Sequence, residues 1–260
     1  MEFFTIFLAS LLALVSPVGL VIDRIALNAI RSQFAKVDQL QVRVDNAPSY
    51  QLLQGKVERV RIAGRGLKLK QQNIRIAVLE LETDPINLKP RSLGQKPQLK
   101  LPFQAGVRLV LTQADINKAL QSPEVTTTLR QLSNQVGRVT SKEGQSYNFV
   151  NPRLELLADR LRFQVELTQA DVTLAITLES GLNVIAGRQI QLVQPIAWVN
   201  GEQVPSQIVT AIATNFSQQL NLGNFETYAT ARILQLKVAP QKLEIVAFLR
   251  VEPSSRLLRR

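Results

Sequence analysis

Apolar and polar residues alternate along the stretch from residue 40 to residue 81. We take this stretch as the centre of the predicted fold. Such alternation is typical of strands in an antiparallel sheet that buries one face and exposes the other. The pattern predicts a short strand over residues 40–45, a turn over residues 46–49, and two long strands over residues 55–70 and 73–82. The centre of the fold is therefore expected to be a sheet.

The alternation changes phase twice within this stretch. Val60 and Ile62 share one parity, whereas Leu67 and Leu69 share the other, and residues 64–66 (Gly-Arg-Gly) lie between them. A second switch separates the apolar residues Ile74, Ile76 and Val78 from Leu79 and Leu81. A side-chain period of two changes phase only where a residue is inserted, so we expect a β-bulge at residues 64–66. Because bulged strands bend and twist, the sequence predicts a strongly curled sheet with a concave apolar face.

Helical and strand-like patterns follow one another in the rest of the chain. Apolar residues at three- and four-residue spacing predict a helix over residues 23–37. Thr112 suits the N-cap of a helix over residues 113–121 with Asp115 in its first turn, and Pro123 suits the start of a second helix that ends near residue 136. Further strands are expected within residues 152–198, 225–238 and 242–251.

The clearest helical pattern covers residues 205–222, with Gly223 as its expected C-cap. Its apolar side chains recur at four-residue spacing: Val204, Ile208, Ile212, Phe216 and Leu220. We interpret this narrow stripe as the side of the helix that packs into a groove of the sheet.

Together these patterns predict the α+β class: a strongly curled antiparallel β-sheet wrapped around a few amphipathic helices, after an N-terminal hydrophobic helix. The chain of 260 residues is long enough for one large domain. We expect residues 23–260 to form that single domain, with sub-halves at about 38–136 and 147–251, and residues 1–22 to form a hydrophobic membrane anchor or signal segment.

Residues 3–22 contain no Lys, Arg, Asp or Glu. As a helix, these 20 residues would span roughly 30 Å, the thickness of a bilayer core. A cleaved secretory signal would carry basic residues before the apolar run and a small-x-small site after it, but Glu2 precedes this run and no such site precedes Asp23. We therefore favour a retained transmembrane anchor over a signal segment or a buried core helix.

The composition removes most kinds of catalytic site. The chain has no Cys and no His, which excludes disulfides, nucleophilic triads and the usual zinc sites. A carboxylate-only hydrolase is the remaining enzyme class, but the acidic residues are scattered at predicted turns and caps: Asp45, Glu58, Asp84, Asp115 and Asp171. We expect no catalytic residues, no metal site and no cofactor, and hence a protein that is not an enzyme.

The net charge of +11 predicts attraction to a polyanion, either nucleic acid or an anionic membrane surface. No aromatic side chain for base stacking lies between Gln51 and Pro102, where many of the basic residues occur. We therefore expect a membrane surface and no nucleic acid as partner. The basic residues of the proline-containing stretch 83–102 are candidates for contact with lipid phosphates, with a solvated surface as the simpler interpretation: Lys89, Arg91, Lys96 and Lys100.

Three stretches carry a resemblance to a known family. They are residues 42–66 (VRVDNAPSYQLLQGKVERVRIAGRG), residues 79–86 (LELETDPI) and residues 107–120 (VRLVLTQADINKAL). In these stretches the chain resembles cyanobacterial members of the LmeA-like phospholipid-binding family. The resemblance implies a curled sheet similar to tubular lipid-binding folds, phospholipid as ligand, and a location at the cell envelope. It favours the periplasmic side, whereas the basic residues after the apolar run favour a cytoplasmic body.

The resulting hypothesis is a membrane-tethered phospholipid-binding protein that holds acyl chains in an apolar cleft between sheet and helices. The cleft candidates are the apolar residues of the predicted helices: Ile116, Leu120, Leu129, Leu132, Ile208, Ile212, Phe216 and Leu220. The alternatives are a ligand-free scaffolding protein of the envelope, which binds a protein partner through an edge strand or the basic loop, and a nucleic-acid binder driven by charge alone.

Overall fold

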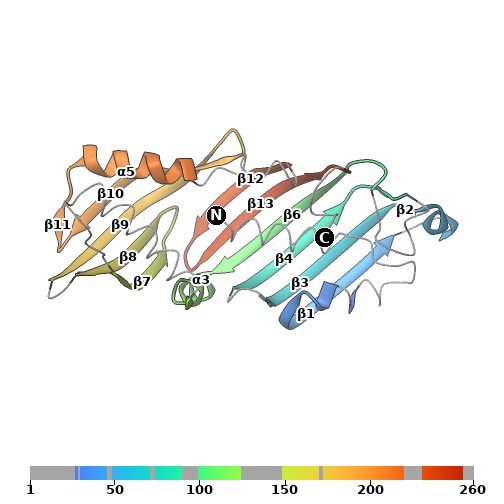
Figure 1. Cartoon of the computed structure of the whole chain (residues 1–260), viewed down its shortest axis with the longest axis horizontal. Coiled ribbons are helices and arrows are strands. Elements are labelled where there is room, and N and C mark those ends of the chain that lie inside the picture. The colour runs from blue at the N-terminus through green and yellow to red at the C-terminus, as the bar shows by residue number, and fades with distance from the viewer. Residues whose placement is uncertain are drawn as a thin grey trace.

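The structure is a computed structural model that describes residues 27–28, 30–45, 49–70, 74–89, 99–123, 148–169, 172–219 and 230–253. Within these residues the chain forms two open antiparallel sheets that lie side by side along the long axis of the molecule (Figure 1). The class is therefore α+β, as predicted, with mostly antiparallel strands and two helices, α3 (Gln113–Leu120) and α5 (Ser206–Gln219).

The larger sheet has six strands in the order β1-β3-β4-β6-β13-β12. Their bounds are β1 Phe34–Asp45, β3 Arg59–Leu69, β4 Arg75–Thr83, β6 Phe103–Thr112, β13 Lys242–Val251 and β12 Thr230–Ala239. The last two strands thus return from the end of the chain to lie beside β6. A short ladder of β2 (Lys56–Val57) and β5 (Ile86–Asn87), with the 3-10 helix η1 (Ser49–Gln54), adjoins the start of β3.

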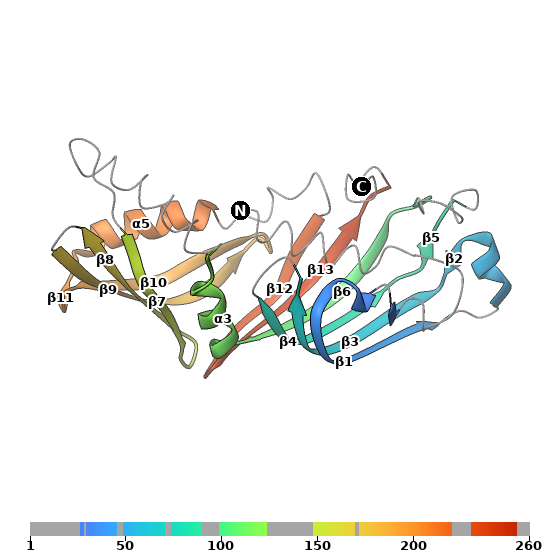
Figure 2. The ribbon, with the colours of Figure 1, turned by 60° about the horizontal axis from the view of Figure 1, so that its bottom comes forward.

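The smaller sheet has five strands in the order β11-β10-β9-β8-β7. Their bounds are β7 Asn148–Leu156, β8 Leu161–Gln169, β9 Val172–Ile185, β10 Gln189–Val199 and β11 Glu202–Gln203. In Figure 2, α5 lies along this sheet and α3 stands between the two sheets. Successive strands are joined by short turns, so this sheet is a simple meander.

The prediction of a strongly curled sheet wrapped around helices is wrong, since both sheets are open. Helix α3 contacts the edge strand β7 of the smaller sheet, and α5 contacts β10, the strand next to the two-residue edge strand β11. The predicted helix over residues 23–37 is also too long, because β1 already begins at Phe34. The predicted anchor, residues 1–22, lies outside the described residues.

The predicted bulge at residues 64–66 is absent, although both phase switches occur. Gly64 pairs with Leu79 and Leu67 pairs with Ile76, so the register of β3 against β4 is the same before and after the switch. Both strands change phase at the same cross-strand position, where Arg65 pairs with Val78. Neither strand then contains an extra residue, and the predicted source of curvature is lost.

Register shifts occur at other positions in the described strands. They lie at residues 34–36 of β1, 150–153 of β7, 193–196 of β10 and 233–235 of β12. Asn151 and Gln194 adopt left-handed backbone angles at two of these shifts, with φ of 53° and 46°. Non-glycine residues pay a conformational cost in this region, so these irregularities must be stabilised by the surrounding sheet.

The apolar face of the six-stranded sheet forms the core. Cross-strand neighbours such as Leu79 and Leu109, or Val107 and Ala247, share this face. Leu67 and Leu79 are 0% exposed, and buried apolar side chains occur on all six strands apart from the middle of β1. The packing explains why this part of the chain forms strands: Val, Ile and Leu fill a half-buried pleated surface well.

The two sheets are joined by main-chain hydrogen bonds. The N–H of Ile233 in β12 donates to the carbonyl of Gly187 in the β9–β10 turn at 2.7 Å. The N–H of Gln241 in the β12–β13 turn donates to the carbonyl of Leu156 at 3.0 Å, and the N–H of Asp159 donates to that of Val238 at 3.3 Å. The contacts therefore fix the smaller sheet to the β12 side of the larger one.

Candidate functional site

The apolar face of the five-stranded sheet is only partly covered. The registers place Phe163 opposite Leu178, Val165 opposite Ile176 and Leu167 opposite Leu174, all on one face. Of these side chains only Val165 is buried, and the others are half-buried. The face thus offers aliphatic and aromatic surface that the described residues do not bury fully, in contrast to the core of the larger sheet.

Helix α5 packs on β10 through small side chains. Its buried residues are Val209, Ala213 and Ser217, which recur every four residues. The Ser217 hydroxyl accepts a 3.5 Å hydrogen bond from the N–H of Leu192, and its carbonyl accepts one of 3.2 Å from the Gln189 side chain. These contacts bring the helix close to the edge of β10.

The interpretation of the stripe Val204–Ile208–Ile212 as the packed side of α5 is wrong. Ile208 is 53% exposed and Ile212 is 63% exposed. The packed side is one residue further on because small residues allow the close approach to β10 that large isoleucines would block. The side chain of Phe216 and the whole of Leu220, the other two cleft candidates on this helix, lie outside the described residues.

Helix α3 covers the opposite edge of the same sheet, where β7 is the terminal strand. Asn117 accepts from the N–H of Leu154 at 2.6 Å and donates to its carbonyl at 2.9 Å. Gln113 accepts from the N–H of Leu156 at 2.7 Å. One turn of helix thus satisfies three backbone groups at the end of β7, which would otherwise be open to pairing with another strand.

The predicted start of α3 is confirmed, since the Thr112 hydroxyl accepts a 3.1 Å hydrogen bond from the N–H of Asp115. The cleft candidates Ile116 and Leu120 are half-buried on this helix. Leu129 and Leu132 lie outside the described residues. The described candidates on α3 and α5 are therefore on helices that pack against β7 and β10, two strands that β8 and β9 separate.

An ion-pair network that crosses β3 at Gly66 holds α3 on the larger sheet. Arg75 of β4 donates to Asp38 of β1 at 2.9 Å and to Asp115 of α3 at 3.1 Å, and the hydrogen bond to Asp38 is the main reason that the pKa of Arg75 is raised. A Cβ at Gly66 would lie 1.9 Å from the Asp38 carboxylate, and Gly66 has φ +59°. The glycine is required at this position for both reasons.

The outer faces of both sheets carry arginines between carboxylates. Arg108 of β6 bonds Glu244 at 2.7 Å and Glu80 at 3.1 Å. Arg162 of β8 bonds Glu179 at 2.6 Å and Glu155 at 2.8 Å. Each arginine thus links its own strand to the strands on both sides, on the face that water reaches.

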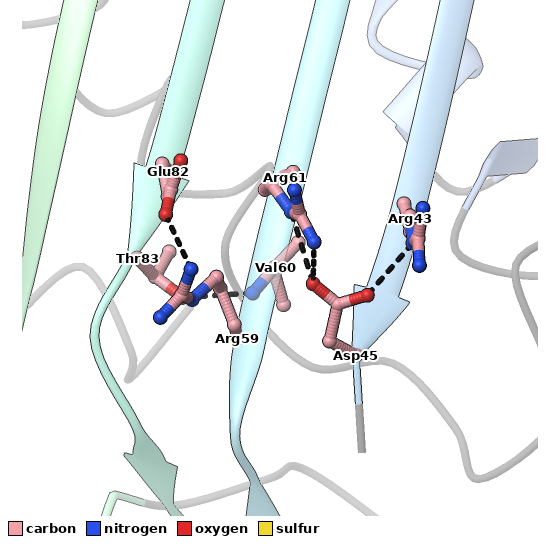
Figure 3. A network of polar contacts seen from close by, with 7 residues as sticks. All are labelled: Arg43, Asp45, Arg59, Val60, Arg61, Glu82 and Thr83. Atoms are coloured by element: carbon pink, nitrogen blue, oxygen red, sulfur yellow. Dashed lines mark hydrogen bonds and ion pairs between the residues drawn. The ribbon is translucent and has the colours of Figure 1, made fainter. Parts of the chain in front are cut away.

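A third network lies at the β1 edge of the larger sheet (Figure 3). Asp45 accepts from Arg43 at 2.7 Å and also from Arg61, and the hydrogen bond from Arg61 is the main reason that the pKa of Asp45 is lowered. Arg59 pairs with Glu82 at 3.0 Å. Each of these three arginines therefore pairs with a carboxylate, and Arg43 and Arg61 share the carboxylate of Asp45.

A pocket of about 470 Å³ opens where the end of α3 meets β7, β8 and β9. Its volume is within the range of ligand pockets, about 300–1,000 Å³. The lining is mixed: Arg153, Gln164, Glu166 and Thr177 stand beside Val165 and Ile176. The pocket thus adjoins the half-covered apolar face and has polar groups at its border.

The phosphate-contact candidates of the basic stretch lie far from the helices. Lys89 and Lys100 are exposed beside β5, where the N–H of Lys100 donates to the carbonyl of Asn87 at 2.8 Å, and Arg91 and Lys96 lie outside the described residues. Within the described part of the chain, no helix has the length and apolar character needed to span a bilayer.

Comparison with known proteins gives one match. The family model described as LmeA-like phospholipid-binding matches residues 16–248, which is most of the chain and includes nearly all of both sheets. No curated protein and no solved structure matches. The chain therefore belongs to the LmeA-like phospholipid-binding family.

Proposed function

We propose that this protein is a non-enzymatic phospholipid-binding protein that holds acyl chains against the half-covered apolar face of the five-stranded sheet. Membership of a phospholipid-binding family supports lipid as the ligand class. The single observation that carries the choice of surface is the partial burial of the apolar side chains on β8 and β9, of which Phe163, Leu174 and Leu178 are examples.

The physical basis of the proposal is the removal of apolar surface from water. Acyl carbon placed on this face would bury protein and lipid surface together, at about 25 cal/mol per Å². A contact of roughly 200 Å² would then contribute about 5 kcal/mol. The exposed pair Ile208 and Ile212 on α5 extends the apolar surface available to lipid.

The proposal includes association with a membrane at the cell envelope. The uncharged run of residues 3–22 would provide the tether, and the net charge of +11 would favour an anionic lipid surface. The tether is testable by extraction: carbonate washing of membranes should leave the full chain in the pellet, whereas a chain that lacks residues 1–22 should be released.

The test of the main proposal is phospholipid recovered from purified protein. The full-length protein, purified in detergent and exchanged into detergent-free conditions by lipid-free polymer, should retain phospholipid measurable by mass spectrometry. The double variant Leu174→Gln and Leu178→Gln makes the centre of the apolar face polar and should lose most of it. Thr173→Gln, on the exposed opposite face of the same strand, is the matched control and should retain it.

Circular dichroism of the three proteins establishes that each is folded before the lipid is measured. Absence of lipid from the folded wild type, or equal lipid in the wild type and the double variant, would contradict the proposal. Wild type without lipid that captures a protein partner would favour the alternative, a scaffolding role. The observation in its favour is that β1 is the terminal strand of the six-stranded sheet among the described strands, and a terminal strand can pair with a strand of another chain.

A further inference from the structure

Three basic side chains line a surface pocket at the start of β1. The pocket has a volume of about 390 Å³ and is lined by Arg31, Lys36 and Lys70, with the polar side chains of Asn28 and Ser32 beside them. Phe34 contributes to the lining and is itself 5% exposed. The arrangement is a basic surface depression beside the buried side chain of Phe34.

Strand pairing brings these residues together from distant parts of the sequence. Phe34 pairs with Leu69 and Lys36 pairs with Lys68, with a register shift between the two pairs. The shift turns Phe34 into the core while Lys36 faces water. The N–H of Lys70 donates to the carbonyl of Gln33 at 3.4 Å, which holds the end of β3 against the turn before β1.

No carboxylate of the described residues compensates the positive charge of this pocket. None of the lining residues is acidic, and across the described ranges no ion pair involves Arg31, Lys36 or Lys70. The neighbouring arginines of the same sheet differ, since Arg61 and Arg75 are both paired with aspartates.

Two like charges at facing positions of β1 and β3 add to this excess. Lys36 lies opposite Lys68 on an antiparallel pair of strands, an arrangement that destabilises a sheet unless an anion lies nearby. A phosphate in the pocket would accept hydrogen bonds from several cationic donors at once, and such charge-assisted bonds are the strong ones.

We propose that this pocket binds the phosphate of an anionic phospholipid headgroup, an inference that rests on the proposed lipid-binding function and adds selectivity for anionic lipid to it. The location favours lipid over nucleic acid. Asn28 follows the uncharged run of residues 3–22 by only six positions, and Phe34, the one aromatic residue of the lining, is buried and unable to stack on a base.

This assignment replaces the contact candidates Lys89 and Lys100 as the headgroup site. Those residues adjoin the start of β3, whereas Lys36 and Lys70 lie at its end. A strand of 11 residues separates the two positions by roughly 35 Å.

The experiment measures which headgroup the full-length protein selects. Protein in mild detergent is mixed with equal amounts of phosphatidylglycerol and phosphatidylcholine, and the lipid retained after gel filtration is quantified by class. The wild type should prefer phosphatidylglycerol, and the triple variant Arg31→Gln, Lys36→Gln and Lys70→Gln should lower the ratio at least about fivefold. Its matched control removes the same charge from three exposed lysines on separate elements, Lys56, Lys118 and Lys237, and should keep the wild-type ratio.

A second measurement isolates the pocket from the apolar face. The water-soluble headgroup glycerophosphoglycerol should raise the melting temperature of the wild type and of the control variant but not that of the triple variant. This shift without any retained lipid would support the pocket while contradicting the proposed function. An unchanged lipid ratio in the triple variant would overturn the inference, and so would an equal shift by inorganic phosphate, which would identify a free-phosphate site.

Discussion

The two sheets share the design of their outer faces and differ in their inner faces. Arg108 and Arg162 each sit on a strand between two glutamates, so both outer faces are polar ladders in water. On the inner side, the larger sheet buries Leu67 and Leu79 completely, whereas Phe163 and Leu178 of the smaller sheet stay half-buried. Among the described residues, the comparison separates a sheet whose apolar face is buried from a sheet whose apolar face is only half-buried.

Helix side chains also bond to backbone groups of two strands of the smaller sheet. Side chains of α3 bond to the backbone of β7, and Ser217 of α5 bonds to the backbone of β10. A sheet with an open face and open edges would aggregate readily. These contacts occupy backbone groups of Leu154, Leu156 and Leu192, which then cannot pair with another strand.

The sharpest test of this division compares leucines of the two inner faces. Leu79→Ala should lower the free energy of unfolding by about 4 kcal/mol, because it leaves a cavity in a close-packed core. Leu178→Ala should cost about 1 kcal/mol, because that side chain is already half in water. Urea unfolding followed by circular dichroism gives both values, and equal losses would remove the distinction between the sheets.

The next largest effect is expected at Gly66, which lets Arg75 reach across β3. Gly66→Ala should lower the free energy of unfolding by about 3 kcal/mol, since it combines a left-handed backbone with a clash against Asp38. Gly106→Ala on β6 is the control, because a Cβ there meets nothing within 4 Å, and it should be neutral or stabilise by about 0.5 kcal/mol. Similar unfolding midpoints for the two variants would argue against the crossing network.

The smallest effect concerns the ladder on the outer face of the larger sheet. The hydrogen bond from Arg108 lowers the pKa of Glu244 below its ordinary value of 4.5. The pair therefore stabilises the fold above pH 4.5, and this contribution disappears as the pH falls through the lowered pKa of the folded state. Glu244→Gln should cost about 0.5 kcal/mol at neutral pH and nothing in strong acid.

Unfolding curves recorded across the acid range measure this difference. Glu202→Gln on β11 serves as the control, since Glu202 is exposed and forms no ion pair with another described residue. A loss for Glu244→Gln that is the same at every pH would show that the ion pair is not its cause.

Local patterns in the sequence predicted the elements better than their packing. Thr112 and Asp115 marked the start of α3, and the alternation found β3, β4, β6 and β13. The prediction of a curled sheet was wrong because a phase switch in one strand does not reveal what the neighbouring strand does. Here β4 changes phase opposite the switch in β3, so neither strand needs an extra residue. The predicted packed side of α5 was wrong because it was chosen by hydrophobicity, which favours Ile208 and Ile212. The helix instead packs on β10 through the smaller side chains of Val209, Ala213 and Ser217, which allow a close approach.

The basic pocket was missed for a related reason. Arg31, Lys36 and Lys70 appear in the sequence as separate charges, and only the pairing of β1 with β3 assembles them. One signal in the sequence could have revealed the pocket: the first two predicted strands follow one another and can pair antiparallel. Extending this pairing toward residue 34 places Lys36 beside the end of β3. The predicted helix over residues 23–37 hid this extension.

The junction between the two sheets rests on amide and carbonyl groups that every residue type supplies. Ile233, Asp159 and Gln241 each contribute only their N–H to it, so these hydrogen bonds do not depend on the chemistry of the side chains. Asp159, Gln241 and Gly187 have left-handed φ of 59°, 63° and 69°, which disfavours β-branched residues at these three positions, and proline would remove any of the three donors. The junction between the two sheets therefore tolerates the exchanges of side chain that keep these backbone angles and the three N–H donors.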